Sequence, residues 1–534
     1  MTAGAVARFF LAQALPRFGR LLGVVALLWL AGCAAVRLDV PRTPSYAIDN
    51  PQETALAISF ARQLAATPGQ SGVHLLVSGQ EAFAARAALA ESAQRTLDLQ
   101  YYLVMRDSTA TLLLHRALLA AERGVRVRLL IDDMNTGLGD GDLAMLSAHP
   151  NVQVRLFNPF AIRGLSSLSR ALELLGHGDR LNRRMHNKLW IADNAAVVMG
   201  GRNLGDAYFD ADSEGGFADL DVLVAGEVVP GISHSFDHYW NSEWTVPIEA
   251  FAVRPVSDSE RDQAMADMAA RAEQFRSGDY VRSVRATELG QQLRAGQLPM
   301  TAANATALYD APGDPRAEVP GKHGEIFPAL REIVEKAQRE VILVSPYLVP
   351  GDRTLDVICG LAKRGVRVRI LTNSLASTDV PVVHAGYARY RPGLLACGAE
   401  VHELRPAADR TARARRGLSS GASLHTKAVI VDGQTAFIGS MNLDPRSRSL
   451  NTEVALRIES APLGRQLVDL FDEATALDQA FRVELDEPGN PAAPLHWTAM
   501  EDDKPVRYTR EPLASTWRRI LTPIFGWLAP EDLL

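Results

Sequence analysis

The alternation of apolar and polar positions predicts a strand–helix–strand unit in the first third of the chain. Apolar and β-branched residues dominate 96–104 and 125–131, which are expected to be strands, and a helical pattern covers 110–123 between them. Gly124 follows that pattern in the position that commonly ends a helix. Because a crossover helix connects parallel strands, this unit indicates an α/β sheet with parallel pairing.

The same order recurs later in the chain, with strands expected at 340–348 and 366–371 and a helix at 353–363 between them. The residues themselves are also similar. Ala-Glu-Arg-Gly-Val-Arg-Val-Arg at 121–128 recurs as Ala-Lys-Arg-Gly-Val-Arg-Val-Arg at 362–369. Solenoid repeats have periods of roughly 20–50 residues, so similarity at this much longer spacing indicates two duplicated domains.

The segments outside the two similar regions complete the predicted organisation. Residues 255–300 are rich in Ala, Arg, Gln and Glu, which favours helix, and helices are also expected at 51–70 and 82–93. We therefore predict a signal segment at 1–33, a lead-in at 34–74, a first domain at 75–250, a helical linker at 251–310, a second domain at 311–485 and a tail at 486–534.

A short polar motif occurs once in each half, as His-Asn-Lys at 186–188 and as His-Thr-Lys at 425–427. In each copy Lys follows His by two positions, Asp by seven and Asn by seventeen. Agreement at four positions is hard to obtain by chance. The motif residues are His186, Lys188, Asp193 and Asn203 in the first copy, and His425, Lys427, Asp432 and Asn442 in the second.

The second copy indicates how the motif is arranged in space. Residues 427–432 read Lys-Ala-Val-Ile-Val-Asp, and Gly433 separates them from the β-branched run at 435–438, which predicts a β-hairpin. Residues two apart on a strand point to the same face, so His and Lys project together. The Asp of each copy lies at the far turn and is expected to shape the hairpin without touching a ligand. The Asn of each copy follows the returning strand, near His and Lys.

Composition and charge narrow the function classes. The chain has 534 residues, 47% of them hydrophobic and 22% charged, as in ordinary globular proteins. The formal net charge of −6 does not indicate a nucleic-acid-binding protein. A local basic groove remains an alternative that the net charge does not exclude. Residues 405–416 are expected to form an arginine-rich loop. Two alternatives remain for it: the arginines are exposed to solvent, or they contact anionic lipid.

The N-terminus resembles a secretory signal. Arg8, Arg17 and Arg20 precede the short apolar run 21–30, which ends in Leu-Ala-Gly-Cys, similar to a bacterial lipobox with Cys33 as the site of lipid attachment. An uncleaved anchor is the alternative, although the run is short for the ~20 residues of a membrane span. Both alternatives place the folded body beyond the inner membrane, because the arginines stay inside. The expected location is the bacterial cell envelope, on the periplasmic side.

Three cysteines cannot form a disulfide framework. Cys359 and Cys397 lie in apolar segments near predicted helices. We expect both to be buried free thiols, with a disulfide between them as the less favoured alternative.

The duplicated His-x-Lys-x4-Asp motif, followed by Gly-Gly-x-Asn or Gly-Ser-x-Asn, resembles the phospholipase D superfamily, and the resemblance covers about residues 75–475. Residues 439–447 with Asn-Thr-Glu at 451–453, Gln-Tyr-Tyr at 100–102 and the segment 384–391 are similar to its bacterial cardiolipin synthase branch. The resemblance implies an α/β fold of two duplicated domains. Each would be a mixed sheet flanked by helices, related by a pseudo-twofold axis with one shared active site.

The residue types suit phosphodiester chemistry. A displacement at phosphorus needs one imidazole to attack and one to protonate the leaving oxygen, which His186 and His425 would supply. Lys188 and Lys427, with the motif asparagines, would stabilise the negative charge on the phosphate oxygens. In the family, acids orient the histidines, and Asp219 and Glu453 are the candidates here, with Asp221 as a competitor for Asp219.

The resemblance implies a phosphatidyltransferase that makes cardiolipin through a phosphatidyl-histidine intermediate. The N-terminal histidine, His186, would be the nucleophile, phosphatidylglycerol the acceptor, and phosphatidylethanolamine or phosphatidylglycerol the donor. The expected partners are phospholipids and the membrane, with no nucleic acid. Hydrolysis of phospholipid or nucleic acid by the same site is the alternative, and a non-catalytic lipid-binding lipoprotein is an alternative of another class. The sequence has no metal-ligand spacing, so no metal or other cofactor is expected.

The C-terminal segment carries a helical apolar pattern, and Pro523 is expected to break it into two short pieces. Two alternatives stay open: the segment packs on the second domain, or it rests on a membrane surface. The apolar positions are Trp517, Ile520, Leu521, Ile524 and Leu528.

Overall fold

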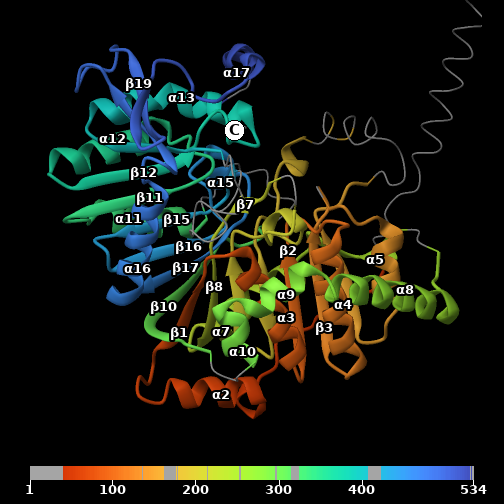
Figure 1. Ribbon diagram of the computed structural model, residues 1–534. Helices are drawn as coiled ribbons and strands as arrows, with labels where there is room; N and C mark the ends of the chain where they lie inside the picture. Colours follow the sequence, from red (N-terminus) through yellow and green to blue (C-terminus); the bar gives the residue numbers. More distant parts are fainter. Residues whose placement is uncertain are drawn as a thin grey trace, which may run out of the picture.

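The computed structural model describes residues 40–134, 136–161, 173, 176, 178–212, 215–251, 254–294, 298–313, 324–406, 423–528 and 531. Cys33, with the whole signal segment, and residues 407–416 of the arginine-rich loop lie outside the described residues. Figure 1 shows two α/β halves side by side, each built on a sheet with helices against it. The sequence predicts this α/β class, and the structure confirms it.

The first half is a mixed sheet whose central strands are parallel, as the strand–helix–strand unit predicts. Its helices are α3 (Gly79–Ser92), α4 (Ser108–Glu122), α5 (Asp140–Ser147) and α7 (Val229–Trp240). In spatial order the strands are β9 (Thr245–Pro247), β4 (Val152–Phe157), β3 (Arg126–Asp132), β2 (Thr96–Tyr101), β5 (Leu189–Ala192), β6 (Ala196–Gly200), β8 (Asp221–Gly226) and β1 (Ser71–Leu76).

The second half repeats that order with equivalent strands. Its helices are α11 (Ile326–Glu335), α12 (Gly351–Lys363), α13 (Pro381–Ala396) and α16 (Ala461–Ala474). In spatial order the strands are β18 (Ala480–Leu485), β13 (Glu400–Leu404), β12 (Arg367–Asn373), β11 (Glu340–Val344), β15 (Ala428–Val431), β16 (Thr435–Gly439), β17 (Val454–Glu459) and β10 (Thr301–Tyr309).

The two sheets share one apolar core. Residues of both sheets and of α7 and α16 form this common core, while α3 and α4 cover the outer face of the first sheet and α11, α12 and α13 cover that of the second. β10 also joins the sheets directly, because its first three residues pair with β1 and the rest with β17. Burial of both faces of each sheet holds the halves in a fixed relation.

Several boundaries differ from the sequence predictions. The first domain ends with η3 (Ile248–Ala250). The linker contains α8 (Asp258–Arg276), α9 (Asp279–Ala286) and α10 (Glu288–Arg294), whereas 301–309, predicted to be part of a helical linker, form strand β10. The lead-in contains η1 (Pro51–Glu53) and α2 (Ala55–Gln63). In the tail, β19 (Leu495–Glu501) and β20 (Lys504–Tyr508) extend the second sheet past residue 485.

The last helix, α17 (Thr516–Leu528), runs unbroken through Pro523, so the prediction of two short pieces is wrong. Proline removes only one hydrogen-bond donor from the helix. Contacts with the second half hold the helix on both sides of it, since Arg518 donates to the Leu375 carbonyl at 2.9 Å and Arg389 donates to the Gly526 carbonyl. Within the described ranges, no helix combines the length and the apolarity needed to cross a bilayer.

Cys359 and Cys397 form a disulfide, with their Cα atoms 5.2 Å apart, so the expectation of free thiols is wrong. The bond joins α12 to the residue that caps α13. These helices lie side by side on the second sheet (Figure 1), a proximity that the sequence does not reveal.

Removing this disulfide by Cys359→Ser together with Cys397→Ser is expected to lower the free energy of unfolding. The bond closes a loop with a sequence separation of 38 residues. In the chain-entropy model, a loop of this length contributes about 3–4 kcal/mol. Urea titration of the variant, against oxidised wild type and wild type in reductant, measures the loss. Equal midpoints in all three samples would show that the bond is absent or without effect.

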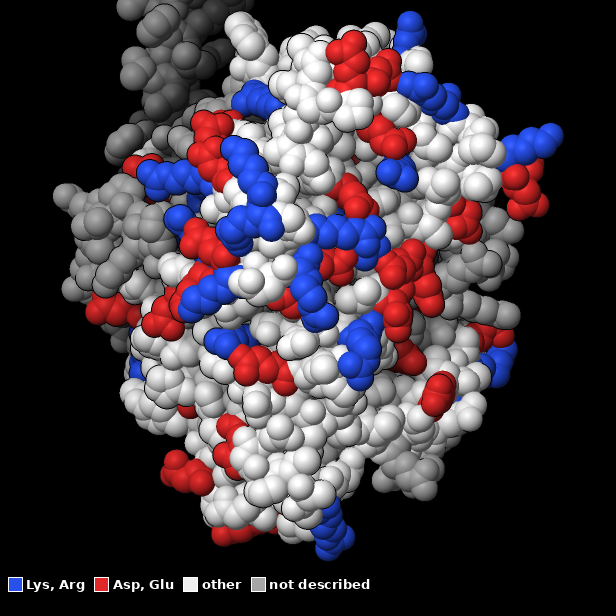
Figure 2. Space-filling view, turned by 90° about the vertical axis from the view of Figure 1, so that its left-hand side faces the viewer, with Lys and Arg blue, Asp and Glu red and all other residues white. Residues whose placement is uncertain are grey.

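The face formed largely by the second half carries charges of both signs, interspersed over the upper and middle parts of the view (Figure 2). Ion pairs of opposite charges are found in the second half, for example Arg367 with Glu400 at 2.7 Å. A continuous basic surface of the kind that nucleic acid selects is not visible on this face.

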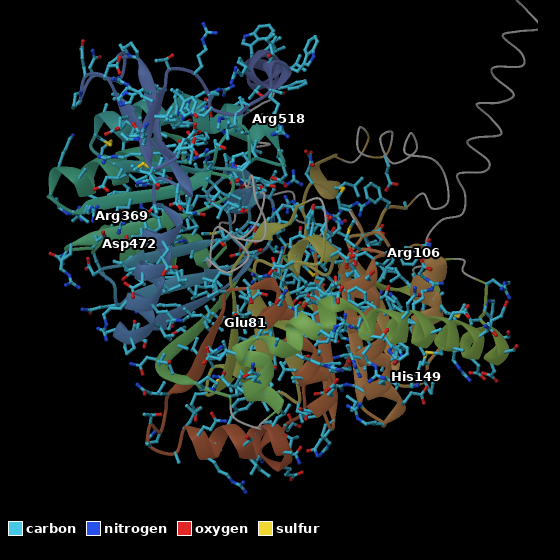
Figure 3. All side chains as sticks on the ribbon, in the orientation of Figure 1. Glu81, Arg106, His149, Arg369, Asp472 and Arg518 are labelled. Carbon is cyan, nitrogen blue, oxygen red and sulfur yellow. A yellow bond between two sulfur atoms is a disulfide. The ribbon has the colours of Figure 1, made fainter. Side chains whose placement is uncertain are left out.

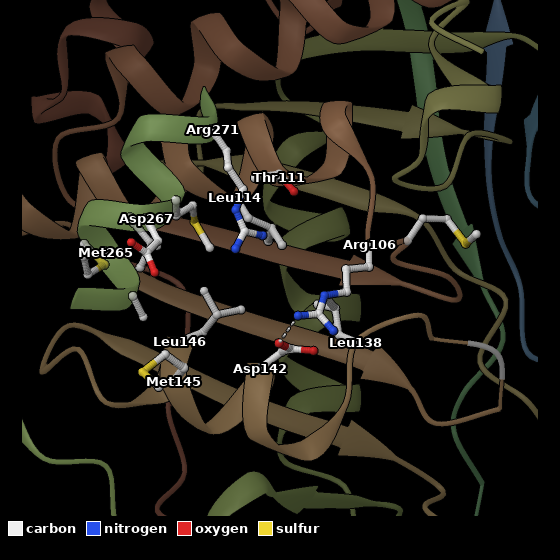
Figure 4. Close-up of a pocket in the computed structure, with 14 residues that line it drawn as sticks. Arg106, Thr111, Leu114, Leu138, Asp142, Met145, Leu146, Met265, Asp267 and Arg271 are labelled. Atoms are coloured by element: carbon white, nitrogen blue, oxygen red, sulfur yellow. Dashed lines mark ion pairs between the residues drawn. The ribbon is translucent and has the colours of Figure 1, made fainter. Parts of the chain in front are cut away.

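A cavity of about 160 Å³ lies between α4, α5 and α8 in the first half (Figure 4). At its mouth Arg106 pairs with Asp142 at 3.5 Å. None of the duplicated-motif residues lines it. Its lining includes the methionines Met105, Met145, Met265 and Met268.

Candidate active site

Each histidine motif is fixed by backbone contacts with the other half. The amide of His186, just before β5, donates to the Thr452 carbonyl at 2.8 Å. The amide of His425, just after β14 (Ser423–Leu424), donates to the Ala218 carbonyl at 2.7 Å. β14 itself pairs with β7 (Phe217–Ala218) of the first half. Both motifs therefore lie at the interface between the halves.

The carboxylates that orient the histidines are exchanged between the halves. His186 Nδ1 is 2.9 Å from Glu453 Oε2, and His425 Nδ1 is 2.6 Å from Asp219 Oδ2. All four side chains are buried. A carboxylate on Nδ1 fixes the tautomer and leaves Nε2 free to act on a substrate. The competitor Asp221 instead pairs with buried Arg86 at 2.9 Å, which makes it part of the structural framework.

The two histidine–carboxylate pairs differ in their support. Glu453 accepts hydrogen bonds from the hydroxyls of Ser440 at 2.5 Å and Ser447 at 2.8 Å. In the first half Gly201 occupies the position equivalent to Ser440. A Cβ atom at residue 201 would overlap the Asp219 carboxylate, so this position requires glycine.

Both motif lysines are buried beside their own histidines. Lys188 Nζ donates to the His186 carbonyl at 2.6 Å, and Lys427 Nζ donates to the His425 carbonyl at 2.5 Å. Burial lowers the pKa of Lys188 to about 7, and it also lowers the pKa of Lys427. Two ammonium groups held at the interface can neutralise a bound phosphate.

The motif asparagines keep hydrogen-bonding capacity for a ligand. Asn203 donates to the Tyr208 hydroxyl at 3.0 Å, while within the described chain the buried Oδ1 atoms of Asn203 and Asn442 have no partner. The motif aspartates lie elsewhere, in left-handed turn conformations. Asp193 accepts from the Arg95 amide at 2.7 Å, and Asp432 accepts from the Arg339 amide, also at 2.7 Å. Each aspartate thus joins its hairpin turn to the start of the central strand.

Aromatic rings line both histidines. The Tyr102 ring lies edge-on to His186, with centroids 5.0 Å apart, and the Lys188 ammonium is 5.4 Å from the same ring. Tyr208 and Phe217 lie 5.3 and 5.1 Å from His425. Sequence reasoning missed both. Phe217 could have been found from its place two residues before Asp219, but Tyr208 ends a single 3₁₀ turn, η2 (Asp206–Tyr208), which is too short to have a sequence pattern.

The charged groups of the two motifs act on each other, and the surroundings of the two histidines differ. Burial, then Lys188, Lys427 and His425, lower the pKa of His186 well below its usual value, which favours the neutral ring. Burial and Lys427 also lower the pKa of His425, but Asp219 opposes this shift. Burial alone would raise the pKa of Asp219; His425 and Lys427 outweigh it and lower that pKa. Burial raises the pKa of Glu453 to about 7.

Comparisons with known proteins agree with this geometry. A family model described as "Cardiolipin synthase, PLD-like domain" matches residues 87–240 and 330–475. Cardiolipin synthase C of Escherichia coli (strain K12) is 39% identical over 471 residues, covering 88% of this chain and 97% of the relative. An uncharacterised protein of Helicobacter pylori (strain J99) is 31% identical, covering 84% and 89%. The fold also matches the crystal structure of phosphatidylserine synthase from Haemophilus influenzae, with a TM-score of 0.54, 13% identity, and coverage of 89% of this chain and all of that one.

Proposed function

The chain belongs to the cardiolipin synthase family with phospholipase D-like domains, and from this premise we propose that it transfers a phosphatidyl group from one phospholipid to another. The acceptor is phosphatidylglycerol, the product is cardiolipin, and the donor is phosphatidylethanolamine or a second phosphatidylglycerol. The observation that carries the proposal is the pair of buried His–Lys motifs at one interface, each histidine held by a carboxylate of the opposite half.

In the first step, His186 Nε2 attacks the phosphorus of the donor lipid. The P–N bond forms as the P–O bond to the departing alcohol breaks, and protonated His425 gives its proton to that alcohol. In the second step, neutral His425 takes the proton of the acceptor hydroxyl, whose oxygen attacks phosphorus and displaces His186. The strong lowering of the His186 pKa favours the nucleophile at this ring, and Asp219, which opposes the downward shift of the His425 pKa, favours the acid at the other.

Lys188 and Lys427 bind the non-bridging phosphate oxygens, with Asn203 and Asn442 as neutral partners. Charge accumulates on these oxygens as the bonds to phosphorus change, so donors fixed beforehand stabilise the transition state more than the ground state. Burial strengthens each of these interactions.

We assign the protein to the bacterial cell envelope, lipid-anchored at Cys33 with the catalytic body on the periplasmic side. The lipobox-like segment motivates the anchor. The Cys359–Cys397 disulfide supports the compartment, because such bonds persist in oxidising environments and are rare in the cytoplasm.

Lipid mass spectrometry of a cardiolipin-deficient bacterium expressing the full chain tests the function. Appearance of cardiolipin, absent when His186→Ala replaces the wild type, is the expected result. Accumulation of phosphatidic acid without cardiolipin would favour hydrolysis by the same site. If neither cardiolipin nor phosphatidic acid appears, the result would favour a non-catalytic lipid-binding protein.

The pH dependence of kcat/KM is expected to show a decrease as the pH rises through about 7, by about tenfold per unit. The pKa of Lys188 is lowered to about 7 by burial, so above this pH the free enzyme loses the proton and with it a positive charge that binds phosphate. Lys188→Arg, which stays protonated, should remove or raise this limb. A wild-type profile that is flat from pH 6 to 9 would contradict the assignment.

Chelators are expected to leave the activity unchanged. Within the ranges that the structure describes, no group of three or more His, Cys, Asp or Glu side chains is placed to bind a metal ion. The two buried lysines supply the positive charge that binds phosphate. Initial rates with and without EDTA on vesicles of constant composition test this. Inhibition that a divalent ion reverses, with vesicle size unchanged, would refute it.

A further inference from the structure

The exposed apolar side chains of the described chain concentrate at one place. Of ten large hydrophobic residues that are exposed, seven lie between 513 and 527. Single exposed apolar residues are common on soluble proteins, whereas contiguous ones mark interaction sites. The seven are Leu513, Trp517, Ile520, Leu521, Ile524, Phe525 and Trp527.

α17 carries six of these seven, and its apolar face points away from the protein. The face turned to α13 is small or polar: Thr522 and Gly526 are buried, and a Cβ at 526 would come within 2.7 Å of Ala385. Trp517 is 72% exposed and Trp527 84%. The helix is thus fastened through its polar side, and among the residues that the structure describes none buries its apolar side.

The segment that holds α17 follows β12, a strand that also contacts the segment before the second histidine motif. Arg518, at the base of the helix in Figure 3, donates to the carbonyls of Leu375 at 2.9 Å and Thr378 at 3.0 Å. These residues follow β12, whose last residue, Asn373, exchanges two hydrogen bonds of 2.9 Å with the Leu424 backbone. Leu424 immediately precedes His425. Through β12, the residues that hold α17 are therefore connected to the segment that precedes the second histidine motif.

A hollow between α13 and α17 adds positive charge next to the apolar face. Arg510, Arg519 and Trp527 are in its wall, together with Arg389, which pairs with Glu531 at 3.5 Å, and its volume is about 660 Å³. Glu511, the acid in the same wall, is already held by Arg391 at 2.8 Å. Arginines beside apolar and tryptophan side chains match the boundary between anionic headgroups and acyl chains.

We propose that α17 is an interfacial helix that docks the protein on an anionic phospholipid bilayer, with the apolar residues in the headgroup boundary and the arginine-lined hollow against lipid phosphate. The helix has 13 residues and is about 20 Å long, too short to span a bilayer but suited to lie in its surface. It lies at the edge of the molecule (Figure 1), where a lipid surface can reach its exposed side. The orientation toward the active site rests on the proposed phospholipid substrate; the docking itself does not.

Depth measurement on the full-length, lipid-anchored protein tests the docking. Ile524→Cys places a fluorophore on α17, and Ile58→Cys, on α2 and 42% exposed, is the matched control. In vesicles of phosphatidylethanolamine and phosphatidylglycerol, a quencher carried in the acyl chains should reduce emission at 524 several-fold more than at 58. Equal quenching at both sites would overturn the proposal.

A second variant separates docking from chemistry. Trp517→Ser, Ile520→Ser, Ile524→Ser and Trp527→Ser together should lower activity on vesicles at least tenfold, with the melting temperature and the activity on monomeric short-chain phosphatidylglycerol unchanged. Full activity on vesicles would overturn the docking role. A different outcome is that sedimentation detects a dimer of the wild type that the variant does not form, with no quenching at 524. This result would assign the apolar face to contact with a second copy of this chain. Inactivity toward every lipid, with quenching intact, would overturn the proposed function and leave the docking.

Discussion

His425→Ala is expected to release one equivalent of p-nitrophenol per active site from a phosphatidyl-p-nitrophenol donor and then to stop, whereas His186→Ala releases none. Nitrophenolate leaves without protonation, so the general acid is dispensable in the first step when His186 is present as nucleophile. The second step still needs His425 to deprotonate the acceptor, and the phosphatidyl-enzyme therefore accumulates. With natural phospholipid, whose alcohol needs the acid, both variants should lose at least about 10³-fold in kcat.

Stopped-flow absorbance measures the burst, and mass spectrometry of the quenched protein locates the phosphatidyl group. Asp432→Asn provides a control in the same hairpin, since this aspartate binds backbone amides away from both histidines. A burst from His186→Ala and none from His425→Ala would reverse the two roles. Bursts from neither variant, with both proteins folded, would contradict a covalent intermediate.

Gly201→Ala is expected to reduce kcat by at least about 10²-fold without contact between residue 201 and the substrate. The added methyl group would overlap the Asp219 carboxylate, which must move and so lose its 2.6 Å contact with His425. Without that contact the His425 ring loses its fixed tautomer and the support for its protonated form. Asp219→Asn, which keeps the shape and removes the charge, should cause a loss of similar size or greater.

Gly360→Ala is the matched control for this substitution. Gly360 lies within α12, and a Cβ there would meet no atom within 4 Å, so activity should be unchanged and stability slightly raised, by up to about 1 kcal/mol. Melting curves of both variants exclude unfolding as the cause of any loss. Normal turnover by Gly201→Ala would contradict the positioning role of Asp219.

The local pattern of residues determines the elements of this protein. The strands expected at 96–104 and 125–131 correspond to β2 and β3, and the helix expected at 110–123 corresponds to α4. Periodicity is a local property, so it predicts elements and, through the repeat, the duplicated architecture. The sequence predicts the boundaries of elements less well. Strand β10 lies where a helical linker was expected, because pairing with β1 and β17 outweighs local composition.

Contacts between distant segments needed the tertiary structure. The bond between His186 and Glu453 spans 267 positions and that between His425 and Asp219 spans 206, so the sequence suggests the two acids but not their exchange between halves. The same holds for the Cys359–Cys397 bond, which depends on how α12 and α13 lie together. The sequence by itself also predicts an apolar face on the last helix. Which way that face points was decided by the small residues that let the opposite side approach α13, since packing follows the shapes of both surfaces and not the pattern of one.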